Sequence, residues 1–574
     1  MNEKCEVDIV FTDKLHSDGI SECYYFDLSD IEAFINIADS PHLDYYINSI
    51  NAWLAQLGMA NNKIDWWCFN ASTRNPLASR LIYDLLAFHC CIEKIQKVPA
   101  RERIFLINAP TVLKNAIYSY FGSQTQTGKA TVYLSGLYVS FISILRLTWQ
   151  LSKAWLTFIP ISQKPVKKGA IGLFTFMDGG ARTNGDPYFG MLDKMIAEIK
   201  PDKQVEHLAL VYQPYRKRLA DGEEYLRTNY SLLFSYLRSA DYFKTWWKYV
   251  CMSFKVFKPD PANKSIPAEY LSILRHTLKS EISRGAAEHY LIYLAFRNLD
   301  REKCFDKIVY PFENKSVEKC LLTGLTEGQI TTVGYQHSSI TKRHYALQLM
   351  EGEFDSIPMP DKIITVGDIT ANWLRNRGNF PPDRVVTGFS LRQTFIDGKH
   401  AKARFTGAPN ILFALSSSKY ELYRTVLFMQ DIKNQLPQWN LGIRCHPNFP
   451  LTTLDQKLQN WILEETSVFA GTTLASNLEW ADILAYISST VALESLLAKV
   501  PVIRLDLEAL NSDPLLNPPA LSWECSGIEG FISAVTEIQE MNTNEREKRV
   551  IAAKNYVHSY LKPYTENVVT EFIT

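Results

Sequence analysis

Hydrophobic runs alternate with amphipathic stretches along the chain and divide it into three blocks. In the first block, residues 1–128, short apolar runs at 7–11 and 103–107 are typical of buried strands. Residues 77–95 have the spacing of a helix with a broad apolar face. We expect a small α/β accessory domain here.

The second block, residues 169–360, begins with a strand at 169–177, a glycine-rich loop at 178–186 and a helix at 188–199. Strand, glycine-rich loop and helix in this order are typical of the start of a doubly wound α/β domain. Further strands of this block are expected at 205–212, 307–311 and 331–336.

The third block, residues 361–545, again alternates strands and helices, which predicts a second Rossmann-like sheet. A helix at 544–561 with one charged face is expected to pack back across the domain boundary, so residues 546–574 form a separate C-terminal segment. The strands of the third block are expected at 362–367, 385–388, 410–415, 441–445, 483–487 and 500–505.

A connector at residues 129–168 separates the first two blocks. Its residues 130–145 carry no charge, but a membrane-spanning helix needs about 20 predominantly apolar residues, so this run is short for a span. Two interpretations remain open: an amphipathic helix that lies in a membrane interface, and a buried pair of core helices.

A second amphipathic stretch, residues 241–258, favours the same membrane contact. On a helical wheel its lysines fall within about 80° of one another, with aromatic residues opposite. An anionic membrane selects such a pattern, although an ordinary surface helix also has it. The lysines are Lys244, Lys248, Lys255 and Lys258.

Composition narrows the class of protein. The chain is 46% hydrophobic and 21% charged, and its 61 basic residues balance 61 acidic ones, so no global positive field for nucleic acid exists. Ten scattered cysteines without a C-x-x-C pair and a polar, acidic N-terminus predict a cytoplasmic protein. Metal-binding, ATP and NAD motifs are missing from the sequence, so we expect no metal and no cofactor.

Phosphate-binding groups recur after two predicted strands of the third block. His446-Pro447 closes the strand 441–445, and the imidazole can donate to a phosphate oxygen, more strongly when it is cationic. Ser488-Ser489-Thr490 follows the strand 483–487, with Ser488 or Ser489 as the expected N-cap of a helix. Ser416 and Ser417 end a third strand and are further candidates.

These motifs resemble the paired HP and SS/T motifs of bacterial sialyltransferases and capsule β-Kdo transferases. Residues 310–319 and 333–339 also resemble motifs of allied surface-carbohydrate biosynthesis proteins. The resemblance covers about residues 170–510. It implies the GT-B fold: two Rossmann-like domains facing a cleft, here with an extra N-terminal α/β region.

The resemblance implies an inverting, metal-independent glycosyltransferase of surface polysaccharide such as capsule or lipopolysaccharide. The donor would be a CMP-activated ulosonic sugar (sialic acid, pseudaminic acid or Kdo), and the acceptor a glycan, free or lipid-linked. Glu494 would bind the nucleotide ribose. The enzyme would work in the cytoplasm, peripheral at the inner face of the membrane.

An inverting transfer needs a general base that faces the cleft from the first Rossmann-like domain. Three residues at predicted strand ends are candidates: Glu313, Asp178 and His337.

Other activities share parts of this pattern. A CDP-polyol phosphotransferase would use the same scaffold, and a UDP-sugar 2-epimerase also carries a segment like His446-Pro447-Asn448. A non-catalytic assembly protein with a degenerate site is the last alternative.

Overall fold

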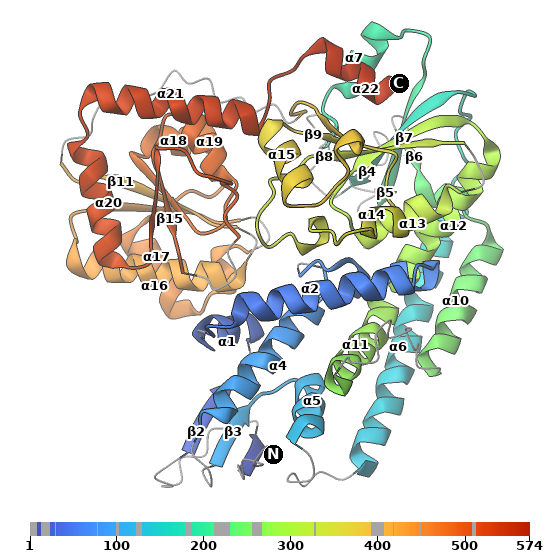
Figure 1. Cartoon of the computed structure of the whole chain (residues 1–574), viewed down its shortest axis with the longest axis horizontal. Coiled ribbons are helices and arrows are strands. Elements are labelled where there is room, and N and C mark those ends of the chain that lie inside the picture. Colours follow the sequence, from blue (N-terminus) through green and yellow to red (C-terminus); the bar gives the residue numbers. More distant parts are fainter. Residues whose placement is uncertain are drawn as a thin grey trace.

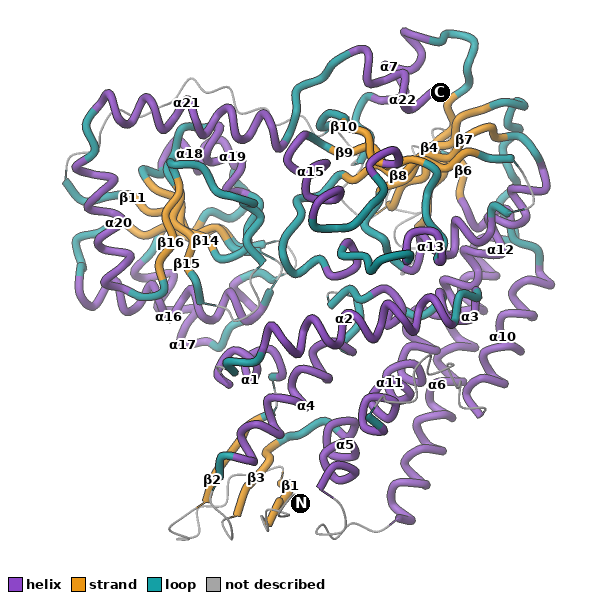
Figure 2. The backbone as a smooth tube through the Cα atoms, in the orientation of Figure 1, coloured by secondary structure: helices purple, strands orange, loops and turns teal. Residues whose placement is uncertain are grey.

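The computed structural model describes residues 8–12, 23–28, 30–38, 40–76, 78–98, 103–121, 129–177, 186, 188–211, 230–254, 267–326, 329–391, 407–416, 418–446, 449–507 and 512–574. Figure 1 shows two α/β domains next to each other, with the N-terminal helices packed beneath them. The strands form three separate sheets, which Figure 2 shows in orange.

The N-terminal region contains a small parallel sheet in the order β1-β3-β2 and helices that pack on it. One of its strands, at 23–27, was not expected from the sequence pattern. The elements are β1 (Asp8–Thr12), β2 (Cys23–Asp27), β3 (Arg103–Ile107), α1 (Ile31–Ala38), α2 (Leu43–Ala60), α3 (Ile64–Trp67), α4 (Leu81–Gln96) and α5 (Thr111–Phe121).

The first Rossmann-like domain is a parallel sheet in the order β10-β9-β8-β7-β4-β5-β6. Numbered from its own first strand, this is the Rossmann order 3-2-1-4-5-6 with one further strand. Its central strands are apolar runs because helices cover both faces of a parallel sheet. The strands are β4 (Ala170–Met177), β5 (Val205–Val211), β6 (Ser231–Leu232), β7 (Phe305–Pro311), β8 (Thr331–Gln336), β9 (Lys362–Thr365) and β10 (Val385–Thr387).

The helices of this domain include α7 (Leu192–Ile199), α13 (Ser316–Gly324), α14 (Glu353–Ser356) and α15 (Asp368–Asn376). A helical layer, made of α6 before β4 and of three helices between β6 and β7, joins the domain to the N-terminal region. Helix α11 packs on α4 and α5, and α10 packs on α6 and α12. These helices are α6 (Lys129–Phe158), α10 (Ser239–Phe254), α11 (Ala268–Glu281) and α12 (Ala287–Glu302).

The N-terminal region and the first Rossmann-like domain share one hydrophobic core. A buried ion pair also joins them: Arg74 donates to Glu353 at 2.6 Å. Separation of the N-terminal region from the first domain would leave each of these charges without its partner. An unpaired charge in the protein interior is costly, so the ion pair keeps the two parts packed together. The N-terminal region is therefore a fixed part of the first domain's body.

The second Rossmann-like domain has a parallel sheet in the order β13-β12-β11-β14-β15-β16, which is the Rossmann order 3-2-1-4-5-6. One face of this sheet packs in a core of its own, and residues of the other face, such as Leu412, Leu484 and Val502, belong to the core that continues into the first domain. The elements of the second domain are β11 (Asn410–Ala414), α16 (Lys419–Gln435), β12 (Asn440–Arg444), α17 (Gln456–Glu465), β13 (Ser467–Val468), α18 (Leu474–Trp480), β14 (Ile483–Tyr486), α19 (Val491–Leu497), β15 (Val502–Leu505), β16 (Ser522–Cys525) and α20 (Ile528–Glu540).

The domain boundary expected at residue 361 is wrong. Strand β9 pairs in parallel with β8, and β10 pairs with β9, so residues 362–387 complete the first sheet. The second domain begins near β11, at Asn410. Hydrophobic pattern identifies these strands but contains no information about the sheet that they join.

Two C-terminal helices return to the first domain. Helix α21 (Thr543–Tyr560) packs on α19 of the second domain and on α15 of the first, and α22 (Glu566–Ile573) packs on α7. The Tyr560 hydroxyl accepts a hydrogen bond from the backbone of Ile340 at 2.9 Å. The last helices therefore tie the two domains together on the side visible at the top of Figure 1.

Within the described part of the chain, no helix combines the length and apolar character needed to cross a membrane. The lysine stripe expected on residues 241–258 does not form one exposed face. Lys248 pairs with Asp65 and lies over the Tyr290 ring, while Lys244 is exposed. Lys255 and Lys258 lie outside the described residues.

Candidate functional site

A cavity of about 1230 Å³ opens between the two Rossmann-like domains and the N-terminal region. All three parts of the chain contribute to its wall. The second domain supplies the largest share, at the carboxyl ends of its strands, where doubly wound sheets bind their ligands. That wall includes Ser416, Ser418, Lys419, Glu421, Arg444, Cys445, His446, Ser488, Ser489 and Thr490.

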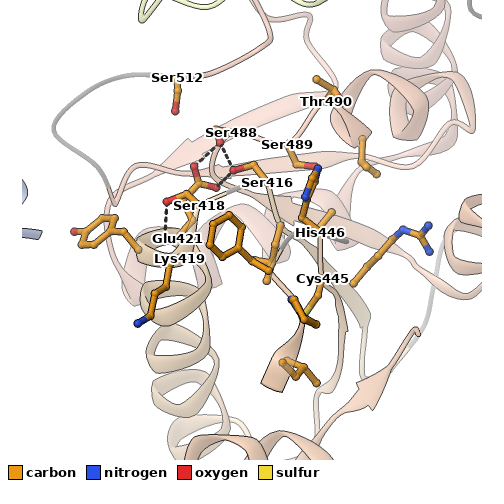
Figure 3. A pocket seen from close by; sticks show the side chains of 18 of the residues that line it. Ser416, Ser418, Lys419, Glu421, Cys445, His446, Ser488, Ser489, Thr490 and Ser512 are labelled. Atoms are coloured by element: carbon orange, nitrogen blue, oxygen red, sulfur yellow. Dashed lines mark hydrogen bonds between the residues drawn. The ribbon is translucent and has the colours of Figure 1, made fainter. Parts of the chain in front are cut away.

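The centre of this wall is the point where the strand order of the second sheet reverses. Strands β11 and β14 are neighbours there, and Ser416 and Ser488 follow them. The Ser488 hydroxyl donates to the Glu421 carboxylate, and its oxygen lies 2.8 Å from the Ser416 oxygen. Ser416 donates to the other Glu421 oxygen at 2.7 Å. Figure 3 shows this three-residue network at the base of the cavity.

Glu421 is a residue of the candidate site to which the sequence pattern gave no role. Ser418 caps α16 and accepts a hydrogen bond from the Glu421 backbone at 3.2 Å. Ser-x-x-Glu at a helix start is a capping-box sequence, in which the glutamate normally turns back to the cap. Here the buried Glu421 side chain binds Ser416 and Ser488 instead. The Ser-x-x-Glu spacing was the signal that could have pointed to Glu421. The partners of the Glu421 side chain, Ser416 and Ser488, lie in loops that this spacing does not involve.

The helix after β14 does not begin as expected. Thr490 occupies the N-cap position of α19 and makes no side-chain capping bond, so neither Ser488 nor Ser489 is the cap. The Ser488 hydroxyl is instead bound to Glu421. Ser489 and Thr490 both line the cavity, and Ser489 is nearly buried.

His446 lies on the same wall, after β12 and half-buried. Burial lowers the pKa of the imidazole below its ordinary value, so the ring is neutral near pH 7. A neutral ring can still donate one N–H to a ligand oxygen. Pro447 and Ser417, which were expected to contact the donor, lie outside the described residues.

Two cations accompany these polar groups. Arg444 ends β12 and donates to Asn477 at 2.6 Å and to the Thr472 carbonyl at 3.1 Å, which fixes the guanidinium at the cavity wall. Lys419 is exposed at the start of α16. Neither was assigned a role from the sequence.

Glu494, the expected ribose ligand, is not among the residues that line the cavity. It lies in the first turn of α19 and is only 4% exposed. Val491, at the start of the same turn, lines the cavity, whereas the Glu494 side chain is buried within the domain. Among the described residues of the second domain, the carboxylate that lines the cavity is Glu421.

The opposite wall comes from the loop after β8. His344 lines the cavity, and its Nδ1 accepts a hydrogen bond from the Thr341 backbone at 2.9 Å. The neutral ring therefore carries its proton on Nε2 and is a donor there. Arg343 is held by Glu32 at 2.8 Å and lies over the Tyr83 ring, so the N-terminal region completes this wall.

Glu313 lies outside the cavity lining, in an ion pair with Lys315 and with its Oε1 3.5 Å from the His337 Nε2. Burial by itself would raise the pKa of Glu313, but the charges of Lys315 and His337 outweigh it and lower the pKa to about 2. A carboxylate with so low a pKa is a weak base near neutral pH.

The other two candidates for the general base are His337 and Asp178. His337 follows β8, lies outside the cavity lining like Glu313, and packs edge-on against the Tyr188 ring. Asp178 lies outside the described residues. Among the described residues no group of three or more His, Cys, Asp or Glu side chains is arranged to hold a metal ion.

No protein-family model matches the chain, and no curated protein matches it. Solved structures with a similar arrangement include a glycosyltransferase from Rickettsia africae, at 10% identity and a TM-score of 0.40, covering 70% of this chain and 96% of that one. UDP-GlcNAc 2-epimerase from Neisseria meningitidis bound to UDP-GlcNAc has 10% identity and a TM-score of 0.39, covering 70% and 99%.

MurG from Acinetobacter baumannii has 12% identity and a TM-score of 0.39, again covering 70% of this chain and 99% of that one. Similarity at this level does not identify an activity. The strand orders and the cavity between the sheets define the architecture by themselves: two Rossmann-like domains face a cleft, as in the GT-B fold.

Proposed function

We propose that the chain is a glycosyltransferase that binds a nucleotide-activated sugar on its second Rossmann-like domain. The observation that supports this most strongly is the network of Ser416, Glu421 and Ser488 at the reversal point of the second sheet. Hydroxyls, backbone N–H groups and cations at this edge suit the phosphate and ribose of a nucleotide.

The donor in this proposal is a CMP-activated ulosonic sugar. Its support is the resemblance of His446-Pro447 and Ser488-Ser489-Thr490 to the paired motifs of transferases that use such donors. His446 is neutral near pH 7, and its N–H would donate to the phosphate. Arg444 and Lys419 would supply positive charge without a metal ion.

The acceptor would be a surface glycan that is free or lipid-linked. It would bind along the cavity wall of the first domain that contains Arg343 and His344. The His344 Nε2–H would donate a hydrogen bond to an oxygen of the acceptor glycan and so orient it. For the general base we retain Asp178 and His337, because the low pKa of Glu313 disfavours it. We further propose a cytoplasmic location at the inner face of the membrane.

Thermal stabilisation by CMP, CDP and UDP and by their sugar conjugates tests the donor. We expect CMP to raise the melting temperature most, because binding to the folded state alone stabilises it. His446→Ala should abolish that shift, whereas the matched control His558→Ala on α21, outside the cavity lining, should retain it. A larger shift with UDP than with CMP would instead favour a UDP-sugar 2-epimerase.

A further inference from the structure

The exposed side of the α6–α10 helix pair is apolar. Seven large apolar side chains on these helices are each more than half exposed, which is unusual for a water-facing helix pair. We define them as the α6/α10 surface: Phe141, Leu145, Trp149, Leu156, Phe243, Trp247 and Phe254.

The two helices form one continuous surface because they are held together along their length. Trp246 of α10 donates to the Thr148 hydroxyl of α6 at 2.9 Å, and Trp155 of α6 donates to the Ser239 hydroxyl at 3.1 Å. The opposite side of α6 is buried through Leu147, Leu151 and Phe158. Core packing therefore fixes which side of each helix points outward.

The exposed charges on α6 are basic, and the one acidic residue of α10, Asp241, accepts hydrogen bonds from Asn298 and from the Arg238 backbone. Helix α6 has no acidic residue in its sequence, and its exposed cations include Arg146 and Lys153. Lys153 lies 4.4 Å from the centre of the Trp149 ring, and Lys244 is exposed on α10. Tryptophan beside lysine is typical of the boundary between lipid acyl chains and headgroups.

We propose that the α6/α10 surface docks the protein on an anionic lipid bilayer. The occupant is a bilayer because the surface is a ridge of two helices with basic flanks, which matches negatively charged headgroups around an apolar interior. Figure 1 shows α6 and α10 extending from the body away from the two sheets. The docking rests on the membrane location proposed above and is independent of the donor.

Flotation of the full chain with vesicles tests the proposal. One set contains phosphatidylcholine alone, and the other contains about 30% phosphatidylglycerol to supply negative charge. We expect binding to the anionic vesicles, reduced at least about tenfold in Trp149→Ser/Trp247→Ser because two interfacial rings are lost. Replacement of Arg146, Lys153 and Lys244 by glutamine should weaken binding by about fivefold per charge.

The matched control is Leu463→Ser/Ile551→Ser, which removes two equally exposed apolar side chains (65% and 61%) from α17 and α21 of the second domain. It should leave vesicle binding unchanged. Equal binding to neutral vesicles, or equal loss in the control, would overturn the proposal. So would a wild-type dimer in light scattering that the tryptophan variant converts to a monomer, because the surface would then bind a second copy.

The outcome is separable from the donor proposal. Thermal stabilisation by CMP needs no vesicles, and flotation needs no nucleotide. Trp149 and Trp247 lie outside the cavity lining, so the tryptophan variant should retain the wild-type shift with CMP.

Discussion

The oxygens of Ser416 and Ser488 lie 2.8 Å apart, although the residues belong to loops that follow different strands. Glu421 holds both hydroxyls through its two carboxylate oxygens. The network thus fixes the distance between two loops at the point where a nucleotide is proposed to bind. A nucleotide phosphate bound here would lie near the negative charge of Glu421. The positive charges of Arg444 and Lys419 would offset the repulsion between these two anions.

Removal of the Glu421 carboxylate should loosen the two loops. Glu421→Ala leaves two hydroxyls without their acceptor, and we expect a loss of about 1–3 kcal/mol in the free energy of unfolding. Glu421→Gln should cost less because the amide oxygen still accepts. Urea denaturation measures both. Ser416→Ala and Ser488→Ala should be non-additive by about 0.5 kcal/mol or more, and strict additivity would contradict a shared network.

Arg74 should be essential to the attachment of the N-terminal region. Its partner Glu353 and Arg74 itself are each 3% exposed, so Arg74→Ala leaves a buried carboxylate unpaired and should cost about 3–5 kcal/mol. Chemical denaturation measures the loss. The control Arg384→Ala breaks a pair with Asp383 in which both side chains are exposed (46% and 79%), and it should cost less than about 1 kcal/mol. The paired change Arg74→Met/Glu353→Leu should restore much of the stability.

His207 should make stability depend on pH in the alkaline range. Burial would lower the pKa of its ring, but Asp186 and Asp193, each 3.6 Å away, outweigh burial and raise the pKa to about 9. A raised folded-state pKa means that the stabilisation is fully present below the ordinary value of 6.5 and is lost as the pH rises to about 9.

We therefore expect His207→Gln to lower the melting temperature at about pH 6 and to have a much smaller effect at about pH 10. Melting curves of the wild type and the variant across this range measure the difference. A difference that stays constant with pH would show that the ring is not charged in the folded protein.

Gly442 in β12 should tolerate no side chain. A Cβ atom there would lie 2.6 Å from the Phe469 ring and 2.8 Å from the Trp480 ring, so Gly442→Ala should cost about 1–3 kcal/mol through forced repacking. Denaturation of the variant measures this. A Cβ atom at Gly527, the N-cap of α20 in the same domain, meets no atom within 4 Å, so Gly527→Ala should cost only the lost capping preference, less than about 1 kcal/mol. Equal stability of both variants would contradict this packing.

Much of the fold follows from local pattern. Strands 170–177 and 410–414 are visible as apolar runs bounded by turn residues, because a strand covered on both faces must be apolar throughout. Polar residues after such runs, as at Ser416, Ser488 and His446, lie at one sheet edge whenever the strands are parallel. The positions of the strands and of the polar residues after them follow from the hydrophobic period of the sequence and from the parallel direction of the strands.

Tertiary structure decided what depends on distant partners. Residues 362–365 and 385–387 joined the first sheet through hydrogen bonds to β8 and β9, which no local pattern encodes. Lys248 left the expected stripe because Asp65 lies beside it. Glu421 became part of the candidate site because parallel strands bring Ser416 and Ser488 together. The sequence determined which segments could bury their apolar faces, and non-local pairing determined which polar groups met.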